Sequence, residues 1–139
     1  MIEVKVTYKD MTPQLLKDLQ AKQISLVTQG GSIIQGAQAS RAPRDTGNLV
    51  NSIQTESFIE DGRAVSETGA TAKHAVYVEY GTGVYAKDGQ GRKTPWTYQD
   101  ELTGEWIRTH GMEAQPFAEP GFQAAKPRID DLAEKVLRA

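Results

Sequence analysis

Cysteine is missing from this chain of 139 residues, and histidine occurs only twice. Without cysteine the protein forms no disulfide framework and no thiolate metal site, although this absence leaves its redox compartment open. The two histidines, His74 and His110, lie outside any HExxH spacing. We therefore predict no metal site and no cofactor, and expect both to be ordinary surface or hairpin-end histidines.

An excess of one charge and long hydrophobic runs are missing as well. Sixteen basic and eighteen acidic residues give a net charge of -2, which offers no general attraction for nucleic acid or an anionic membrane. No apolar run approaches the ~20 residues that span a bilayer, and residues 1–6 alternate instead of resembling a signal peptide. We expect a soluble chain with no membrane partner.

The sequence also lacks a recognisable catalytic arrangement. No spacing forces two carboxylates together as acid and base; the acidic residues considered are Asp45, Glu67, Glu79 and Asp100. The glycine-rich segments 81–83 and 89–94 lack the lysine or glycine spacing of a phosphate-binding loop. We predict that the protein is not an enzyme and that it has no catalytic residues.

The residues that are present indicate one small domain, residues 1–139. This length suits a single core, and a hydrophobic content of 38% predicts that the core is modest. Alternation over residues 2–8 predicts a half-buried strand. Thr12 as N-cap and Pro13 in the first helical position predict a long helix, whose apolar positions recur to about Ala39.

A glycine pair, Gly30-Gly31, interrupts this helical pattern. Each glycine costs about 1 kcal/mol relative to alanine inside a helix. The pair predicts either a kink or loose join between two helices, or a close backbone crossing against the sheet or a sister subunit.

A turn and a β-hairpin follow. Pro43 ends the helix and residues 44–47 form a turn, in which Asp45 or Thr46 caps a short helical segment over 48–52. That segment anchors Leu49 in the core, and Gly47→Val lowers stability if Gly47 takes a positive φ. Strands over 53–59 and 63–69 pair around Asp61-Gly62, a favoured two-residue hairpin loop.

The second half of the chain predicts a projecting part and a closing helix. Residues 75–80 form a short helix capped by Gly81, and 81–94 form a mobile glycine-rich loop. Strands over 96–99 and 105–109 form a hairpin with aromatic cross-strand pairing, so that 81–111 projects from the domain. A C-terminal helix begins near Pro120 and is kinked by Pro127.

The expected fold class is therefore α+β. A long N-terminal helix and a C-terminal helix pack on a small antiparallel sheet, with a projecting loop and hairpin.

Three signatures, residues 42–49, 77–83 and 115–120, supply turn, cap and packing residues. Together with 92–96 and 109–111, and in this order, they resemble the tail-component family of long-tailed phages and prophages, which is named for gene product ten of an HK-type lambdoid phage. The resemblance runs from about Leu15 to the C-terminal helix. It implies a non-enzymatic virion protein at the head-tail interface that completes the tail or joins it to the head.

The resemblance also implies partners. They are identical copies in a ring, a hexamer in the virion and a monomer in solution, together with the head-completion or connector protein and the tail-tube or tail-terminator protein. The protein would be assembled in the host bacterial cytoplasm, and DNA would only pass through it. The candidate structural and assembly residues are Pro43, Asp45, Thr46, Gly47, Leu49, Glu79, Gly81, Thr82, Trp96, Trp106, Pro116 and Phe117.

Two alternatives stay open. The first is a nucleic-acid-binding or toxin-type interaction module of prophage origin, in which Trp96 joins the basic residues Lys87, Arg92 and Lys93. Three charges give little affinity for phosphates at physiological salt, which favours a solvated loop. The nearer alternative is a tail terminator or head-completion subunit in an adjacent layer of the same junction.

Overall fold

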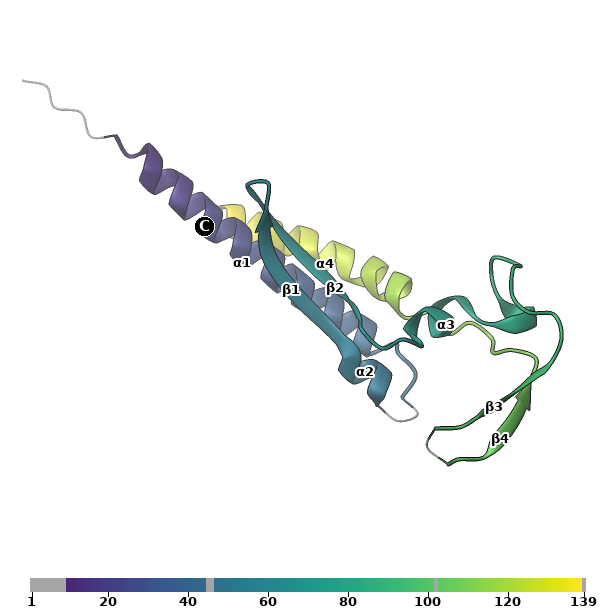
Figure 1. The fold of residues 1–139 in the computed structure, drawn as a ribbon. Coiled ribbons are helices and arrows are strands. Elements are labelled where there is room, and N and C mark those ends of the chain that lie inside the picture. Colours follow the sequence, from purple (N-terminus) through teal and green to yellow (C-terminus); the bar gives the residue numbers. More distant parts are fainter. Residues whose placement is uncertain (1–9, 45–46, 102, 139) are drawn as a thin grey trace, which may run out of the picture.

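Two long helices and a β-hairpin lie side by side in an elongated molecule (Figure 1). The structure is a computed structural model that describes residues 10–44, 47–101 and 103–138. Its elements in chain order are α1 (Thr12–Ala39), α2 (Asn48–Ser52), β1 (Ile53–Glu60), β2 (Arg63–Ala70), α3 (Ala75–Tyr80), the 3-10 helix η1 (Gly83–Tyr85), β3 (Trp96–Gln99), β4 (Trp106–Thr109) and α4 (Ala118–Arg138).

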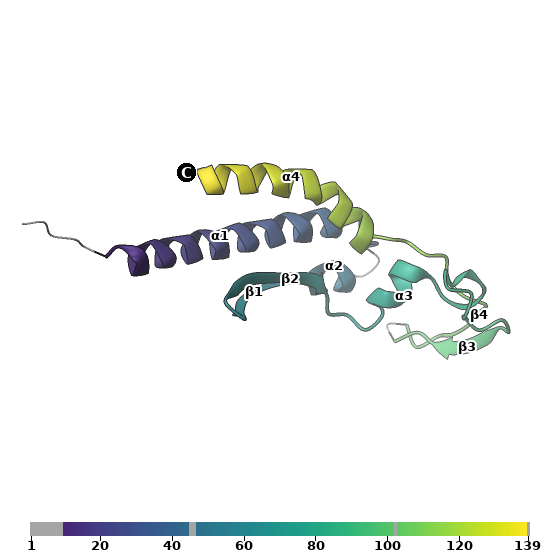
Figure 2. The same ribbon diagram turned by 90° about the horizontal axis from the view of Figure 1, so that it is seen from above.

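Helix α1 is the middle layer of the fold. Figure 2 shows α4 along one side of α1 and the β1–β2 hairpin along the other. The small helix α3 and the β3–β4 hairpin extend beyond one end of these layers. This arrangement confirms the predicted α+β class with long N- and C-terminal helices on small antiparallel sheets.

The start of α1 differs from the prediction by one residue. Met11 holds the N-cap position and Thr12 is already helical, with Pro13 in the first turn as expected. The Thr12 N–H donates to Asp10 Oδ1 at 2.9 Å, so the acceptor is the aspartate two residues earlier and Thr12 was the wrong N-cap. The strand predicted over 2–8 lies outside the described residues.

The glycine pair does not break α1, so the predicted kink or loose join was wrong and the close crossing was right. Gly30 faces Ile129 of α4, where an added Cβ would lie 3.7 Å from Ile129 Cγ2. Gly31 faces the hairpin instead, and an added Cβ would overlap the side chains of Thr55 and Ser66. Because the two glycines are adjacent, they let α1 approach both neighbouring layers at one level.

The hairpin rests on α1 through hydroxyl groups. Thr55 and Thr68 stand opposite each other in the register, with their Oγ1 atoms 2.9 Å apart. Both hydroxyls lie close to the Gly31 carbonyl oxygen, at 3.1 and 3.2 Å respectively. Thr55 Oγ1 is also 2.8 Å from Gln35 Oε1. This contact between helix and sheet is thus directional and partly polar.

The β1–β2 hairpin follows its predicted turn. Its antiparallel register runs from Ile53 opposite Ala70 to Glu60 opposite Arg63. Asp61 and Gly62 have φ values of 49° and 76°. Both positive angles are those that a two-residue loop of this type requires, so the turn prediction is confirmed.

The β3–β4 hairpin has a different pairing from the one predicted. Trp96 stands opposite Thr109, Tyr98 opposite Ile107, and Trp106 opposite Gln99. No aromatic residue of these strands faces another, so the expected aromatic pairing was wrong. Since directly paired residues share a face and successive residues alternate, Trp96 and Tyr98 share one face and Trp106 lies on the other.

Helix α4 crosses α1 closely and contains an internal proline. An added Cβ on Gly121 would come within 2.8 Å of Gln38 backbone atoms. The side-chain Nε2 of Gln38 donates to the Ala118 carbonyl at 3.1 Å. Pro120 lies in the first turn as predicted, and Pro127 lies inside the helix, where it removes one backbone donor. Figure 2 shows α4 bending between its first turns and the rest.

Candidate functional site

The three sequence signatures meet in the core. Phe117, from the third signature, is only 2% exposed. It clusters with Leu49 of the first signature and Val78 of the second. We name this cluster the signature junction and define it by its buried residues, Ala42, Leu49, Ile53, Ala75, Val78 and Phe117. Segments far apart in the chain therefore converge on one packed point.

Glu79 connects α3 to the start of α4. Its carboxylate is buried, and it accepts hydrogen bonds from three successive backbone N–H groups. The Oε2 atom accepts from Phe117 at 2.7 Å and Ala118 at 2.9 Å, and Oε1 accepts from Glu119 at 3.1 Å. These N–H groups belong to the first turn of α4 and the residue before it, where a helix leaves donors unsatisfied. Glu79 is therefore the cap of α4, supplied from another helix.

The environment of Glu79 favours its ionised form. Burial disfavours the charged carboxylate and acts to raise its pKa, but the N–H groups of Ala118, Phe117 and Glu119 outweigh burial and, with the Lys87 charge, lower the pKa below its ordinary value. The positive end of the α4 dipole favours the same charge. Glu79 is thus a structural anion at neutral pH.

Backbone bonds join the second and third signatures further. The Gln115 N–H donates to the Val78 carbonyl at 2.8 Å, and the Thr82 N–H donates to the Met112 carbonyl at 2.9 Å. The Met112 N–H returns a bond to Thr82 Oγ1 at 2.9 Å. Gly81 ends α3 with a φ of 79°, which confirms the predicted C-cap. Pro116 is half-buried directly before the capped turn.

The first signature supplies a corner. Gly47 has a φ of 77° and holds the N-cap position of α2, which confirms its positive φ. Leu49 is 4% exposed and Pro43 is half-buried. The cap that we expected from Asp45 or Thr46 lies outside the described residues. This turn redirects the chain from the end of α1 into α2, which contributes Leu49 to the signature junction.

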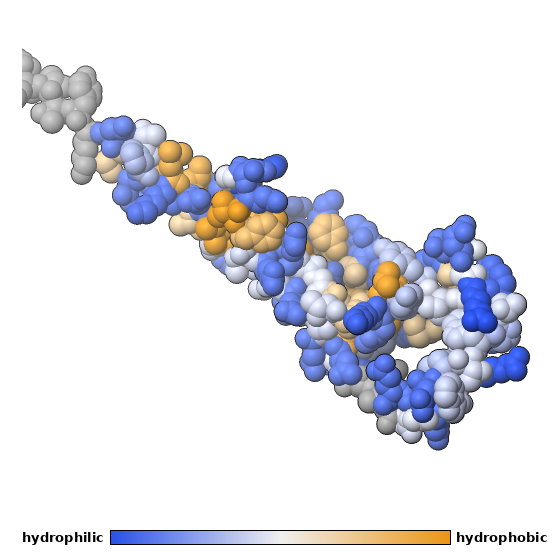
Figure 3. Space-filling view, in the orientation of Figure 1, coloured by the Kyte–Doolittle hydropathy of each residue, from blue (hydrophilic) through white to orange (hydrophobic). Residues whose placement is uncertain are grey.

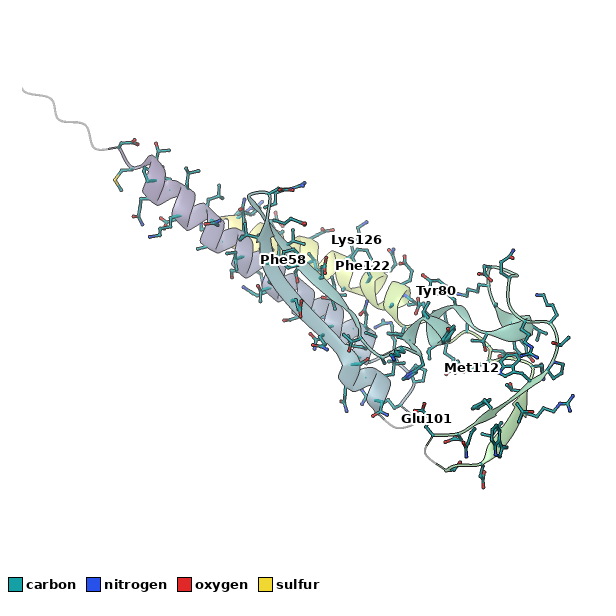
Figure 4. All side chains as sticks on the ribbon, viewed as in Figure 1. Phe58, Tyr80, Glu101, Met112, Phe122 and Lys126 are labelled. Carbon is teal, nitrogen blue, oxygen red and sulfur yellow. The ribbon has the colours of Figure 1, made fainter. Side chains whose placement is uncertain are left out.

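A wide groove lies between α3 and β3. We name it the aromatic groove and define it by Tyr77, Tyr80, Trp96 and Tyr98; it has a volume of about 970 Å³. Residues of the glycine-rich loop complete its wall. The guanidinium carbon of Arg92 lies 5.7 Å from the centroid of the Trp96 ring, a cation–π distance. Figure 4 shows Tyr80 beside the start of α4 and Glu101 at the loop end of the β3–β4 hairpin.

The glycine-rich loop makes close backbone contacts at two of its glycines. An added Cβ on Gly83 would overlap the His110 carbonyl, and one on Gly91 would overlap the Gly83 carbonyl. The Lys87 N–H also donates to the Tyr80 carbonyl at 3.0 Å. These contacts hold the loop near the base of the β3–β4 hairpin. Its mobility stays a prediction.

No metal centre appears among residues 10–44, 47–101 and 103–138. In these ranges no three potential ligands gather where they could hold a metal ion. His74 and His110 are exposed, and His110 Nε2 lies 3.2 Å from the Tyr85 hydroxyl. Within the same ranges no helix is long and apolar enough to cross a membrane. The absence of enzymatic activity stays a prediction.

The capping role of Glu79 was missed at the sequence level, although a signal for it exists. Pro116-Phe117 precedes α4, and neither side chain can accept a bond from the first N–H groups of that helix. A helix without a local cap must obtain its acceptor elsewhere in the fold or from water. The sequence alone does not indicate which of its acidic residues lies close enough.

A comparison with protein families matches residues 9–81 to a family model described as "Bacteriophage HK97-gp10, putative tail-component". The matched residues make up more than half of the chain and extend from the start of α1 through α3 to Gly81. No curated protein and no solved structure matches the chain. The match contains the first signature and the second as far as Gly81, and the third lies beyond it.

Proposed function

The chain belongs to the HK97-gp10 tail-component family of bacteriophages, and on that premise we propose that it joins head and tail. In this proposal the protein is one subunit of a homo-oligomeric ring that completes the tail at the head-tail junction of a long-tailed phage or prophage. Family membership supports the coarser role, a structural tail protein of the virion. The ring and its position at the junction are our proposal.

One observation carries the proposal: the signature residues serve packing and capping, while large apolar side chains stay exposed at both ends of the molecule. Leu15 and Leu16 at the start of α1 are 65% and 62% exposed, and Trp106 in the distal hairpin is 70% exposed. Large exposed apolar surfaces mark sites of protein contact. A subunit with neighbours on two sides fits this pattern.

A subunit at the head-tail junction would have three kinds of neighbour. Identical copies form the ring, a hexamer in the virion and a monomer in solution. The head-completion or connector protein lies on one side, and the tail-tube or tail-terminator protein lies on the other. The net charge of -2 supports passage of DNA without retention.

Deleting the gene from its parent phage or prophage tests the proposal. We expect induced cells to contain filled heads and separate tails, since neither product needs this subunit until they join. Supplying the wild-type chain from a plasmid should restore joined particles in negative-stain micrographs. Joined, infectious particles in the deletion strain would overturn the proposal.

The alternatives predict different outcomes in the same strain. A tail terminator would leave tails of irregular length when deleted, and a head-completion subunit would leave heads that lose their DNA. A nucleic-acid-binding module would use the observed contact of Arg92 with Trp96. It would also retain DNA with a steep salt dependence. We expect no such retention at physiological salt.

A further inference from the structure

We propose that the first turns of α1 in one subunit dock into the aromatic groove of the next subunit. This inference deepens the proposed ring and rests on it. The docking segment is residues 12–24, and the receiving surface is the groove between α3 and β3. Both surfaces belong to the same chain, so every subunit donates one helix end and receives another.

The docking segment carries exposed leucines on one side. Leu15, Leu16 and Leu19 are 65%, 62% and 46% exposed. Leu19 lies three and four residues after the other two, so the three side chains form one apolar stripe. Figure 1 shows these turns extending beyond both α4 and the β1–β2 hairpin, and Figure 3 shows apolar surface gathered there.

The groove offers a complementary surface. Tyr77 and Tyr80 are 56% and 57% exposed, and Tyr98 is 43% exposed on the strand face that it shares with Trp96. These rings line an open volume of about 970 Å³. Figure 3 shows a hollow between the distal hairpin and the rest of the molecule. Aromatic walls with polar tips are typical of the central part of protein interfaces.

The length of α1 excludes the chain's own first turns as the occupant, which leaves the first turns of a second copy as the occupant we propose. Helix α1 has 28 residues, which makes it about 42 Å long, and the groove lies beyond its C-terminal end. The first turns therefore cannot fold back into their own groove. A contact between two different patches of identical subunits repeats head to tail and closes into a ring when the rotation allows it.

The charges at the two surfaces can be paired. Lys17 and Asp18 are exposed beside the leucine stripe. Asp88 and Arg92 line the groove and are exposed as well. Each surface thus carries one charge of each sign next to its apolar part. This pattern allows two opposite-charge pairs and selects the orientation of the docked helix.

The size of the contact explains how a monomer in solution can form a ring. Residues 12–24 span about 20 Å, and one face of a helix about 10 Å wide covers far less than the about 800 Å² per partner of a stable interface. A single contact is therefore weak. In a closed ring each subunit makes two contacts, and tail proteins that hold subunits together raise their effective concentration.

Cysteine cross-linking tests the contact directly, because the chain contains no cysteine of its own. In the Leu16→Cys/Tyr80→Cys variant one thiol lies on the docking segment and the other in the groove. We expect oxidised phage particles carrying this variant to give a ladder of covalent multimers on a denaturing gel. The matched control, Leu16→Cys/Glu101→Cys, moves the second thiol to the hairpin loop end and should give no ladder.

Several outcomes would overturn the interface. These are particles that contain the variant but give no ladder, a product that stops at a dimer joined through Leu16→Cys alone, and a cross-link to a different virion protein. If the double variant does not enter particles, purified Leu16→Cys and Tyr80→Cys chains are mixed at high concentration. A mixed disulfide dimer is then expected, and its absence overturns the proposal.

Charge substitutions separate this interface from the proposed function. Leu16→Glu should abolish incorporation into particles, whereas Leu137→Glu, the same change at a site that is 58% exposed at the end of α4, should leave it unchanged. Normal incorporation of Leu16→Glu would refute the interface and leave the head-tail role standing. Absence of the wild-type chain from purified particles would refute the head-tail role itself.

Discussion

The signature junction and the first turns of α1 both carry large apolar side chains, yet their surroundings are opposite. Phe117 in the junction is 2% exposed, whereas Leu15 in α1 is 65% exposed. The junction receives residues from α1's end, α2, β1, α3 and the start of α4. The first turns of α1 extend past the end of α4 (Figure 2), and their leucines stay exposed. Apolar content therefore does not identify the core, because burial depends on which segments meet.

This difference in burial suggests separate roles for the two regions, one in folding and one in assembly. The junction holds the layers together, and its residues should control the free energy of unfolding. The first turns of α1 contribute little to folding and are available to another subunit. Mutations in the two regions should therefore be separable by measuring stability and assembly independently.

Phe117→Ala should have the largest effect on stability. Truncating a buried phenylalanine typically costs about 3–5 kcal/mol, and we expect a loss of that size in urea unfolding followed by circular dichroism. Phe122→Ala, five residues further along in α4, is the matched control, since Phe122 is 40% exposed. Equal losses for the two variants would show that the junction is not the main core.

Gly31→Ala should have the next largest effect. The new methyl group overlaps Thr55 and Ser66, and such overpacking costs about 1–3 kcal/mol. Gly36→Ala in the same helix meets nothing within 4 Å and should stabilise by about 0.5–1 kcal/mol. The melting temperatures of the two variants should move in opposite directions. A rise for Gly31→Ala would contradict the close crossing of helix and hairpin.

Glu79→Gln should lower stability at neutral pH by about 0.5–2 kcal/mol, the usual range for a lost helix cap. The folded pKa of Glu79 lies below the unfolded value of about 4.3. Its contribution is therefore complete above that value and fades as the pH falls through the folded pKa. The gap between wild type and variant should narrow from pH 6 toward acid in urea titrations. A gap that stays constant would assign the effect to packing alone.

Leu15→Gln should have the smallest effect on stability. The side chain is exposed and the two residues have similar helix propensities, so unfolding should change by less than about 0.5 kcal/mol. Dilute protein, at concentrations where it is monomeric, is the appropriate sample for this melting experiment. A loss above 1 kcal/mol would show that the first turns of α1 belong to the core of the subunit.

Much of the fold could be predicted from local patterns. Asp61-Gly62 indicates its hairpin because both residues must take positive φ, and the recurring apolar positions of α1 indicate a helix to Ala39. The predicted aromatic pairing failed because it depended on neighbours in space. The register of β3 and β4 sets which residues face each other, and Trp96 and Trp106 fall on opposite faces.

The candidate site was predicted as a set of residues but not as an arrangement. Leu49, Glu79 and Phe117 stood in separate signatures, and the sequence indicated turn or packing roles for each. Only the fold brings the Glu79 carboxylate to the N–H groups of Phe117 and Ala118. The aromatic groove likewise combines α3 with β3, whose relation in space no local pattern contains.

Local sequence patterns specify the elements of this protein, their turns and its resemblance to a phage tail-component family. Those properties depend on φ preferences, periodicity and residues close together in the chain. Packing of the folded chain sets the cap of α4, the two-sided crossing at Gly30 and Gly31, and which apolar residues stay exposed. These depend on contacts between segments far apart in sequence, because burial and hydrogen-bond satisfaction are properties of the packed chain.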